Sequence, residues 1–471
     1  MNTNASDFMR SFQPAYRDDG FDAERAAEVI ATCLQHDDAA TLRAWFGQGL
    51  AADVADALDH LKPAQLVAAL LLVPAAEQAR VFGYLPLARQ TRVVAGMPRT
   101  AVIELLGRMS SDERVDLFNT LPEGREALLP ALAQAQRDDI RRLASYKQGR
   151  VGAIMTSQYA TLSPHLTATE AIDELRRIAP DSETIYNAYV VDDERRLIGV
   201  TTLRRLILAA PATRLADMME SHPVTAYVDD LQHVAAEKIA HYDFIALPII
   251  DREHRLIGIV TADDAMDVME DEATEDFQKS GGSLGRWPLR MKDATIRLLY
   301  RKRVFWLVLL VFANIFSGAG IAYFENLITA NVALVFFLPL LIDSGGNAGS
   351  QSATLMVRAL ATGDVQLRDW ASMLGRELIV AALLGLTMAI AVSLVGVFRA
   401  GVAVALAVAL TMQVVVIVGS VIGMSLPFLL SRFKADPASA SSPLITTIAD
   451  ASGIFIYFAI ASQVLPAFAN G

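Results

Sequence analysis

The sequence predicts an α-helical membrane protein whose first part lies in the cytosol and combines a helical repeat with two small α/β modules. Three observations support this fold class. Uncharged apolar stretches long enough to cross a membrane follow Arg303. A proline recurs about every 12 residues between 61 and 122, and a pattern of alternating strands and helices occurs twice between 153 and 269.

The charge of the chain is unevenly distributed. The 471 residues carry a net charge of −11, but the part from Arg303 onward holds 7 acidic and 7 basic residues. The first 302 residues hold the other 45 acidic and 34 basic residues. Such an acidic part argues against nucleic acid as a partner, because phosphate binding requires a basic surface, and it is compatible with a cation ligand.

The compartment follows from the cysteine count and the amino terminus. The single cysteine, Cys33, has no partner for an internal disulfide. The first residues lack the apolar core of a secretory signal, so we expect the acidic part to stay in the cytosol.

Five membrane spans fit the apolar part. Since about 20 apolar residues cross the membrane as a helix, the second span is expected to run through or just past Asp343. The uncharged stretches are 304–324, 326–342, 378–398, 400–431 and 443–449, the last resuming after Asp450. Basic residues flank the spans mainly on one side, which predicts a cytosolic amino terminus and an extracytoplasmic carboxyl terminus. They are Arg297, Arg301, Lys302, Arg303, Arg358, Arg368, Arg376, Arg432 and Lys434, against Arg399 alone on the other side.

Polar groups inside the spans indicate an ion path. Asp343 opens the run Asp-Ser-Gly-Gly-Asn-Ala-Gly-Ser-Gln, and Asp450 lies in span five. Such groups are costly at membrane depth and usually face a partner helix or water. The glycines can serve close helix packing, and Asp450 can be a buried hydrogen-bond partner. We favour a path for Mg²⁺, a hard cation with oxygen ligands, lined by Asp343 and Asn347 on either side of a Gly-Gly break.

The first part begins with a repeat of short helices. Proline suits the first turn of a helix and serine caps one, so a stacked helical solenoid is predicted. The register is marked by Pro63, Pro74, Pro86, Pro98 and Pro122, with Ser110 in the remaining slot.

Two α/β modules follow the repeat. The strand pair 185–191 and 197–200 resembles the pair 244–250 and 256–260, and each copy starts with a segment that contains methionine, Met155-Thr-Ser or Met218-Met-Glu. Such a tandem usually pairs into one regulatory unit.

An acidic segment connects the modules to the membrane part. Asp263–Asp276 holds eight carboxylates in 14 residues without Lys or Arg, and Met266 and Met269 continue an apolar stripe that predicts a helix. Because like charges destabilise a helix, we expect a counter-cation here, with a plain acidic linker helix as the alternative.

The order of these parts resembles the MgtE-type magnesium channels. The most specific motifs are L-P-L-L-I-D-S-G-G-N-A-G-S-Q-S-A-T (338–354), R-A-L-A-T-G-D (358–364) and D-A-S-G (450–453). The resemblance implies a homodimer in the lipid of the cytoplasmic membrane that imports Mg²⁺, and it identifies the α/β modules as cystathionine-synthase-type (CBS) modules. The implied layout is an N-terminal tail (1–25), a helical-repeat domain (26–148), two CBS modules (149–210 and 211–262), an acidic connecting helix with linker (263–300) and a transmembrane pore domain (301–471).

The resemblance also implies roles for carboxylates. Asp450 matches the pore aspartate, and its two copies would hold a hydrated Mg²⁺ on the dimer axis. Matches to the family's Mg²⁺-sensing positions are Asp112, Asp116, Asp243, Asp264, Glu272, Glu275 and Asp276. At low Mg²⁺ these carboxylates would repel and the pore would open, and at high Mg²⁺ bridging ions would close it.

The sequence departs from the family pattern at a few positions. Leu231 and His233 stand in a run that is often acidic, which leaves the number of sensor ions open. Arg205 replaces the nucleotide-reading aspartate of the first module, whereas Thr261 and Asp264 keep that motif in the second. We therefore expect Arg205 to weaken the binding of ATP.

Other functions fit less well. A permease for Co²⁺, Mn²⁺ or Ni²⁺ would favour His or Cys ligands, and no histidine follows His254. A membrane sensor that binds an ion without conducting it is the alternative from another class. An enzyme is not expected, because the sequence has no nucleophile elbow, P-loop or metal-ligating His motif.

Overall fold

The structure is a computed structural model that describes residues 16–17, 20–121, 128–282, 295–440 and 442–469. Most of the predicted tail, the proline mark at Pro122 and the linker segment 283–294 lie outside the described residues. The chain forms two compact units, Met1–Met269 and Glu270–Gly471.

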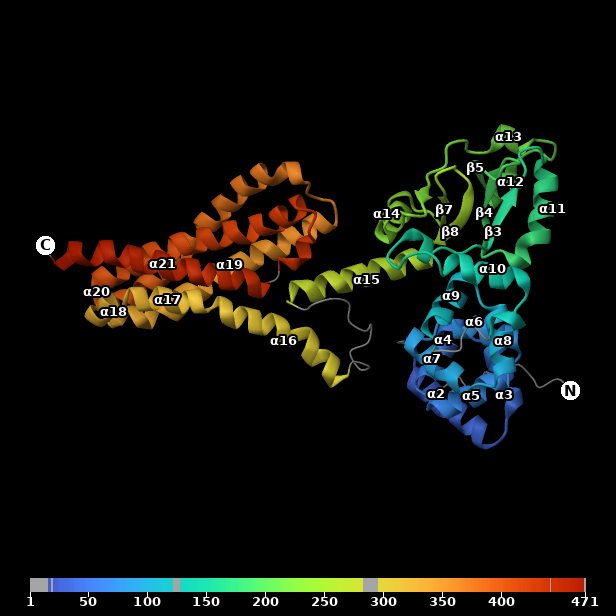
Figure 1. The fold of residues 1–471 in the computed structure, drawn as a ribbon, viewed down its shortest axis with the longest axis horizontal. Helices are drawn as coiled ribbons and strands as arrows, with labels where there is room; N and C mark the ends of the chain where they lie inside the picture. Colours follow the sequence, from blue (N-terminus) through green and yellow to red (C-terminus); the bar gives the residue numbers. More distant parts are fainter. Residues whose placement is uncertain (1–15, 18–19, 122–127, 283–294, 441, 470–471) are drawn as a thin grey trace. The chain divides into compact units, whose positions relative to one another are not determined.

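Short helices follow one another in the first unit, which confirms the predicted repeat (Figure 1). Pro74, Pro86 and Pro98 each stand directly before a helix, where the missing N–H is not needed. Ser110 stands at the same position before α9, but its side chain forms no capping hydrogen bond with the described residues. After the strand pair β1 (Tyr16–Arg17) and β2 (Gly20–Phe21), the helices are α2 (Ala23–Gln35), α3 (Ala39–Gln48), α4 (Ala51–Asp59), α5 (Pro63–Leu71), α6 (Ala75–Phe82), α7 (Leu87–Gly96), α8 (Arg99–Arg108), α9 (Ser111–Thr120), η3 (Leu129–Ala131) and α10 (Gln134–Leu143).

Alternate helices of the repeat stack on each other. Helix α4 contacts α2 and α6, and α6 contacts α8, whereas α7 contacts α5 and α9. Each short helix therefore buries its apolar side between neighbours two steps away, as in a solenoid. The resulting core includes Trp45, Phe46 and Phe82, all fully buried.

Each α/β module contains a three-stranded sheet of the same topology, which confirms the predicted duplication. In both, the first strand is parallel to the second and the second is antiparallel to the third. The first module contains η4 (Val151–Ala153), β3 (Tyr159–Leu162), α11 (Ala168–Ile178), η5 (Ala179–Asp181), β4 (Thr184–Val191), β5 (Leu197–Thr202) and α12 (Leu203–Leu208). The second contains α13 (Leu215–Met218), β6 (Ala226–Tyr227), α14 (Gln232–Tyr242), β7 (Ala246–Ile250) and β8 (Leu256–Thr261), followed by α15 (Ala262–Ser280).

The two modules exchange their first segments. Thr156, at the start of the first module, forms two backbone hydrogen bonds with Ile259 of β8, at 2.8 and 3.0 Å. Glu220, at the start of the second, forms the equivalent pair with Val200 of β5, at 2.9 and 3.0 Å. Each sheet is thus completed by backbone from the other module.

A methionine and a glycine complete each exchange. A Cβ atom on Gly258 would lie 2.6 Å from the sulfur of Met155, and one on Gly199 would lie 2.5 Å from the sulfur of Met219. Only glycine leaves room for the methionine, so the methionine-containing segments predicted to start each module have a packing role on the partner sheet.

The second unit contains long apolar helices. In the described residues, four helices are long and apolar enough to cross a membrane: Ile296–Tyr323, Ala333–Ala361, Leu367–Arg432 and Ser442–Leu465. The third has 66 residues, about three times the length that a membrane requires. Gly401, with φ 82° and ψ 170°, divides it into two helical segments, so the apolar segments number five, as predicted.

These segments comprise the remaining elements. They are α16 (Ile296–Ala313), α17 (Ile315–Tyr323), α18 (Glu325–Ala330), α19 (Ala333–Ala361), η7 (Leu367–Asp369), α20 (Trp370–Arg432), η8 (Pro437–Ser439) and α21 (Ser442–Ala469). Helices α19, α20 and α21 pack against one another, and α17 packs against α21.

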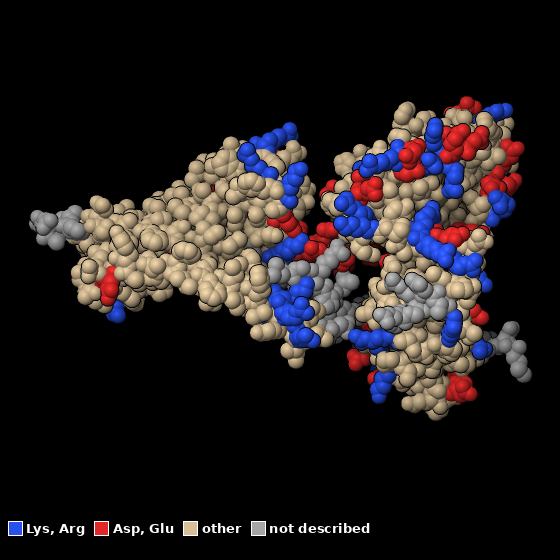
Figure 2. Space-filling view, in the orientation of Figure 1, with Lys and Arg blue, Asp and Glu red and all other residues tan. Residues whose placement is uncertain are grey.

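The outer surface of this unit suits a lipid environment. Leu383, Leu394 and Phe398 are 61, 62 and 91% exposed. In Figure 2 a broad uncharged band covers the unit, and charged side chains gather only at its two ends in this view. An apolar surface of this extent marks contact with membrane or protein.

Two details of the predicted second span are wrong. The span begins at Ala333, because residues 325–330 form the separate helix α18. The predicted Gly-Gly break is absent, since Gly345 and Gly346 lie inside the continuous helix α19. The glycines remain helical because neighbouring helices approach them closely.

Candidate functional site

The second unit, Glu270–Gly471, is called the membrane unit below. Two of its helices carry polar side chains at helical spacing. Asp343, Asn347 and Ser350 follow one another along α19, and the amide nitrogen Nδ2 of Asn347 donates to Oδ2 of Asp343 at 3.0 Å. Ser442 and Asp450 lie eight residues apart on α21, and the Ser442 hydroxyl donates to that of Ser350 at 2.9 Å. The residues predicted for the ion path are therefore on two adjacent helices.

Glycines bring α19 close to a third helix, α20. Gly345 and Gly349 of α19 lie against Gly419 and Gly423 of α20, and a Cβ atom on Gly349 would be 2.7 Å from the carbonyl oxygen of Gly419. The close-packing interpretation of the glycine-rich run therefore holds for these residues.

The adjacent glycine positions the aspartate of α21. A Cβ atom on Gly346 would lie 2.5 Å from Cγ2 of Thr446 and 3.3 Å from Oδ1 of Asp450. The absence of a side chain at Gly346 thus lets Asp450 approach α19, where it interacts electrostatically with Asp343. Oδ1 of Asp450 is buried and has no hydrogen-bond partner among the described residues.

A cluster of carboxylates lies in the first unit, where helix α9 meets the modules. Asp112 and Asp264, predicted as sensor residues, are brought together there, and Asp116 belongs to the same group. Glu113, Glu183 and Asp263 complete the cluster, because each acts electrostatically on other members. Asp112 has one carboxylate oxygen that is buried without a hydrogen-bond partner in the described part of the chain.

Burial and mutual repulsion favour the protonated forms of this carboxylate cluster. Burial, followed by the charge of Asp112, raises the pKa of Asp264 to about 8 and that of Glu113 to about 7. The same two causes raise the pKa of Asp116 to about 6 and that of Glu183 to about 7. Burial also raises the pKa of Asp112 itself. A cation that entered the cluster would favour the ionised forms instead.

Hydroxyl groups connect the carboxylate cluster to its surroundings. The Thr261 hydroxyl donates to Oδ2 of Asp264 at 2.5 Å. The hydroxyls of Ser111 and Thr156 lie 2.9 Å apart and join α9 to the segment that starts the first module. The carboxylate cluster is therefore held by the helical domain and both modules.

A second acidic group lies at the end of α15. Lys279 binds Oε1 of Glu275 at 2.7 Å and Oδ2 of Asp436, in the loop before α21, at 2.5 Å. Burial raises the pKa of Asp276, with further contributions from Asp436 and Glu272. Burial lowers the pKa of Lys279, but its bonds to Asp436 and Glu275 outweigh this effect, so the net shift is upward.

Two further predicted positions, Asp243 and Arg205, lie in the modules. Asp243 is exposed and ends α14 in a left-handed conformation with φ 53°. In the first module the Arg205 guanidinium donates to the carbonyl of Met218 at 3.3 Å.

Sequence reasoning missed four acidic residues of these groups. Glu113 adjoins Asp112, and Asp263 belongs to the acidic segment, so both could have been included. Glu183 and Asp436 stand alone in the sequence and only the fold brings them to the carboxylates.

The described residues contain no group of three or more His, Cys, Asp or Glu side chains that could hold a metal ion directly.

A helical domain, two α/β modules and a unit of long apolar helices that carry polar side chains fit a membrane transporter. Family models agree: "divalent cation transporter" matches residues 338–460, "MgtE intracellular N domain" matches 50–149, and "CBS domain" matches 151–212 and 215–271. The magnesium transporter MgtE of Thermus thermophilus is 37% identical over 94% of this chain and 99% of its own length. That of Bacillus subtilis is 30% identical over 87% of this chain and 93% of its own length. The chain belongs to the MgtE family of magnesium transporters and not to an enzyme family.

Two solved structures are similar to about half of this chain. The soluble part of a magnesium transporter is 29% identical, with a TM-score of 0.51, over 53% of this chain and 99% of the other. The cytosolic domain of the Mg²⁺ channel MgtE in complex with ATP is 35% identical, with a TM-score of 0.49, over 51% of this chain and 99% of the other.

Proposed function

We propose that this chain forms a homodimeric channel that imports Mg²⁺ across the cytoplasmic membrane and is closed by cytosolic Mg²⁺. The observation that carries the proposal is the carboxylate of Asp450. One of its oxygens is buried in an apolar unit and has no hydrogen-bond partner among the described residues. An ionised group at membrane depth usually has a functional partner, and a hydrated divalent cation supplies both charge and hydrogen-bond donors.

The surrounding polar groups support Mg²⁺ as the cargo. Asp343, Asn347 and Asp450 offer oxygen atoms, which hard cations prefer. No histidine or cysteine lies in the membrane unit, whereas softer metals favour such ligands. Two copies of Asp450 facing each other across a dimer axis would repel without a cation, so the ion would hold the pore geometry.

Gating is assigned to the carboxylates of the first unit and of α15. Burial and mutual repulsion disfavour ionisation of Asp112 and Asp264, so their association depends on protons or cations. Cytosolic Mg²⁺ would neutralise the carboxylate cluster and draw the helical domain onto the modules. At low Mg²⁺ the repulsion would separate them and release the pore.

Mg²⁺ flux into sealed liposomes tests the conduction proposal. Asp450→Asn should lower the flux on the order of tenfold or more, since hydrogen bonds to a charged group contribute more than those to a neutral one. Glu325→Gln, which neutralises an exposed carboxylate at the start of α18, is the matched control and should conduct normally.

The same liposomes separate the alternatives. Wild-type flux through Asp450→Asn would contradict the pore assignment. Binding of Mg²⁺ without any flux in the wild type would favour the non-conducting sensor, and faster uptake of Co²⁺ or Mn²⁺ than of Mg²⁺ would favour the permease for softer metals.

A further inference from the structure

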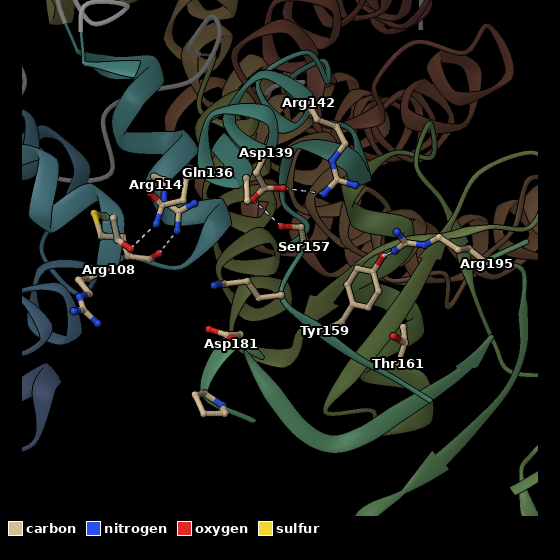
Figure 3. Close-up of a pocket in the computed structure, with 15 residues that line it drawn as sticks. Arg108, Arg114, Gln136, Asp139, Arg142, Ser157, Tyr159, Thr161, Asp181 and Arg195 are labelled. Atoms are coloured by element: carbon tan, nitrogen blue, oxygen red, sulfur yellow. Dashed lines mark hydrogen bonds and ion pairs between the residues drawn. The ribbon is translucent and has the colours of Figure 1, made fainter. Parts of the chain in front are cut away.

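An open cavity of about 610 Å³ lies in the first unit where the helical domain meets the first CBS module (Figure 3). The end of α8, helix α10, the residues 157–161 and the turn before β5 surround it. Ligand cavities commonly measure ~300–1,000 Å³, so a small molecule fits. The carboxylates assigned to ion sensing do not line it.

The charge of this cavity is opposite to that of its surroundings. Four arginines line it, Arg108, Arg114, Arg142 and Arg195, against two acidic residues, Asp139 and Asp181. The first 302 residues as a whole carry 45 acidic and 34 basic side chains. A local excess of guanidinium in an acidic unit indicates an anionic ligand.

Two of the arginines have structural partners. Arg114 is buried and donates to the carbonyl oxygens of Leu106 and Met109, at 2.7 and 2.6 Å. Arg142 forms an ion pair with Asp139 at 2.8 Å. These bonds fix the wall of the cavity and occupy N–H groups of both side chains.

The other two arginines are available to a ligand. Arg108 is exposed, and no hydrogen bond or ion pair ties its side chain to another described residue. The guanidinium of Arg195 donates to the hydroxyl of Tyr159 at 3.0 Å, which positions it at the cavity, and its other N–H groups have no hydrogen-bond partner in the part of the chain that the structure describes. Figure 3 shows Arg108 and Arg195 on opposite sides of the cavity.

This arrangement indicates the chemistry of the ligand. Two guanidinium groups on opposite sides of a cavity suit an anion with more than one charged group, and guanidinium matches phosphate with paired hydrogen bonds. The ring of Tyr159 packs edge-on against Tyr189, at 6.5 Å between centroids, which fixes its place in the wall of the cavity. We propose that this cavity binds a small polyphosphate anion between Arg108 and Arg195.

Calorimetry on the full chain in detergent tests this site. Inorganic tripolyphosphate is titrated in Mg²⁺-free buffer into the wild type, into Arg108→Gln/Arg195→Gln and into Arg141→Gln. Arg141 is a neighbour on α10 that is 66% exposed and does not line the cavity. The double variant should bind at least ~10-fold more weakly, because two charge-assisted contacts are lost, and Arg141→Gln should bind as the wild type does. Unfolding temperatures establish that all three proteins are equally folded.

Other probes distinguish the source of the signal. Citrate, a polycarboxylate, should bind more weakly than tripolyphosphate. ATP binding that the double variant loses would support the same site. The proposal would be overturned if tripolyphosphate did not bind to the wild type, or if it bound equally to all three proteins. It would also be overturned if the double variant kept ATP binding while tripolyphosphate did not bind.

Discussion

At the scale of single residues, glycines control how closely α19 and α20 approach. A Cβ atom on Gly423 would overlap the backbone carbonyl oxygen of Gly349, which cannot move without shifting α19. Gly346 of the same helix stands beside Asp450 of α21, so one turn of α19 packs against α20 and also positions the aspartate.

Gly423→Ala should therefore destabilise the membrane unit by about 1–3 kcal/mol, the usual effect of overpacking, and should lower Mg²⁺ flux. Thermal unfolding in detergent and liposome flux measure the two effects. Gly375→Ala is the control, because a Cβ atom there meets nothing within 4 Å and alanine favours a helix over glycine. Equal effects of the two substitutions would contradict the packing argument.

Arg205 provides a second test at this scale. Arg205→Asp should strengthen ATP binding to the full chain, because an acidic group accepts hydrogen bonds from ribose hydroxyls whereas guanidinium only donates them. Calorimetry in Mg²⁺-free buffer measures the change, and Arg177→Asp, on the exposed side of the same module, is the control. Unchanged or weaker binding in Arg205→Asp would show that this position does not read the nucleotide.

At the scale of elements, α15 combines acidic side chains with one internal cation. The ammonium group of Lys279 bridges Glu275 and Asp436, so α15 is tied to the loop before α21 by an internal cation.

Lys279→Gln should make closure more dependent on Mg²⁺. Without the ammonium group, Glu275, Asp276 and Asp436 repel one another, so a higher internal Mg²⁺ concentration should be needed to close the pore. The coupling between two sites typically amounts to about 1–3 kcal/mol, so the midpoint Mg²⁺ concentration for closure should shift by roughly 5–150-fold. Patch-clamp open probability across an internal Mg²⁺ series measures the midpoint.

The opposite substitutions complete this test. Neutralising Glu272, Glu275 and Asp276 together removes both repulsion and bridging, so the response to internal Mg²⁺ should become weak. An unshifted midpoint in this triple variant and in Lys279→Gln would place the sensor elsewhere.

Sequence patterns predicted elements better than they predicted contacts between elements. The proline register identified the short helices, and the duplicated strands identified both modules, because these signals are local. The Gly-Gly pair of α19 was misread as a break, since the sequence does not show that the backbone of α20 lies against it. Glu183 and Asp436 were missed for the same reason: their partners are distant in the chain.

At the scale of the whole molecule, protons and Mg²⁺ should compete for the carboxylate cluster. The pKa of Asp264 is about 8, against an ordinary value of 3.8, so the folded state binds its proton more tightly than the unfolded chain does. The stability contributed by this proton is complete below about pH 4 and is lost as the pH rises toward 8. Glu113 and Glu183 act in the same direction, with pKa values of about 7.

Hydrogen exchange measured on the full chain tests this expectation. Without divalent cations, exchange of amides in α9 and the first turns of α15 should accelerate as the pH rises from about 5 to about 8, beyond the intrinsic effect of pH on exchange. Millimolar Mg²⁺ should suppress the acceleration, and Asp112→Asn should reduce it because Asp112 is the shared source of repulsion. Protection that is independent of both pH and Mg²⁺ would contradict the sensor assignment.

The exchange of first segments between the two CBS modules makes each module depend on the other for a complete sheet. A chain divided near residue 212 would separate Thr156 from Ile259 and Glu220 from Val200, which leaves an unpaired sheet edge and an uncovered glycine on each half. Recombination that joins either half to a foreign module would produce the same defect unless the new module carried a matching methionine segment. We therefore expect evolution to lose, gain or transfer these modules in pairs, with the spacing between them conserved more strictly than the residues that occupy it.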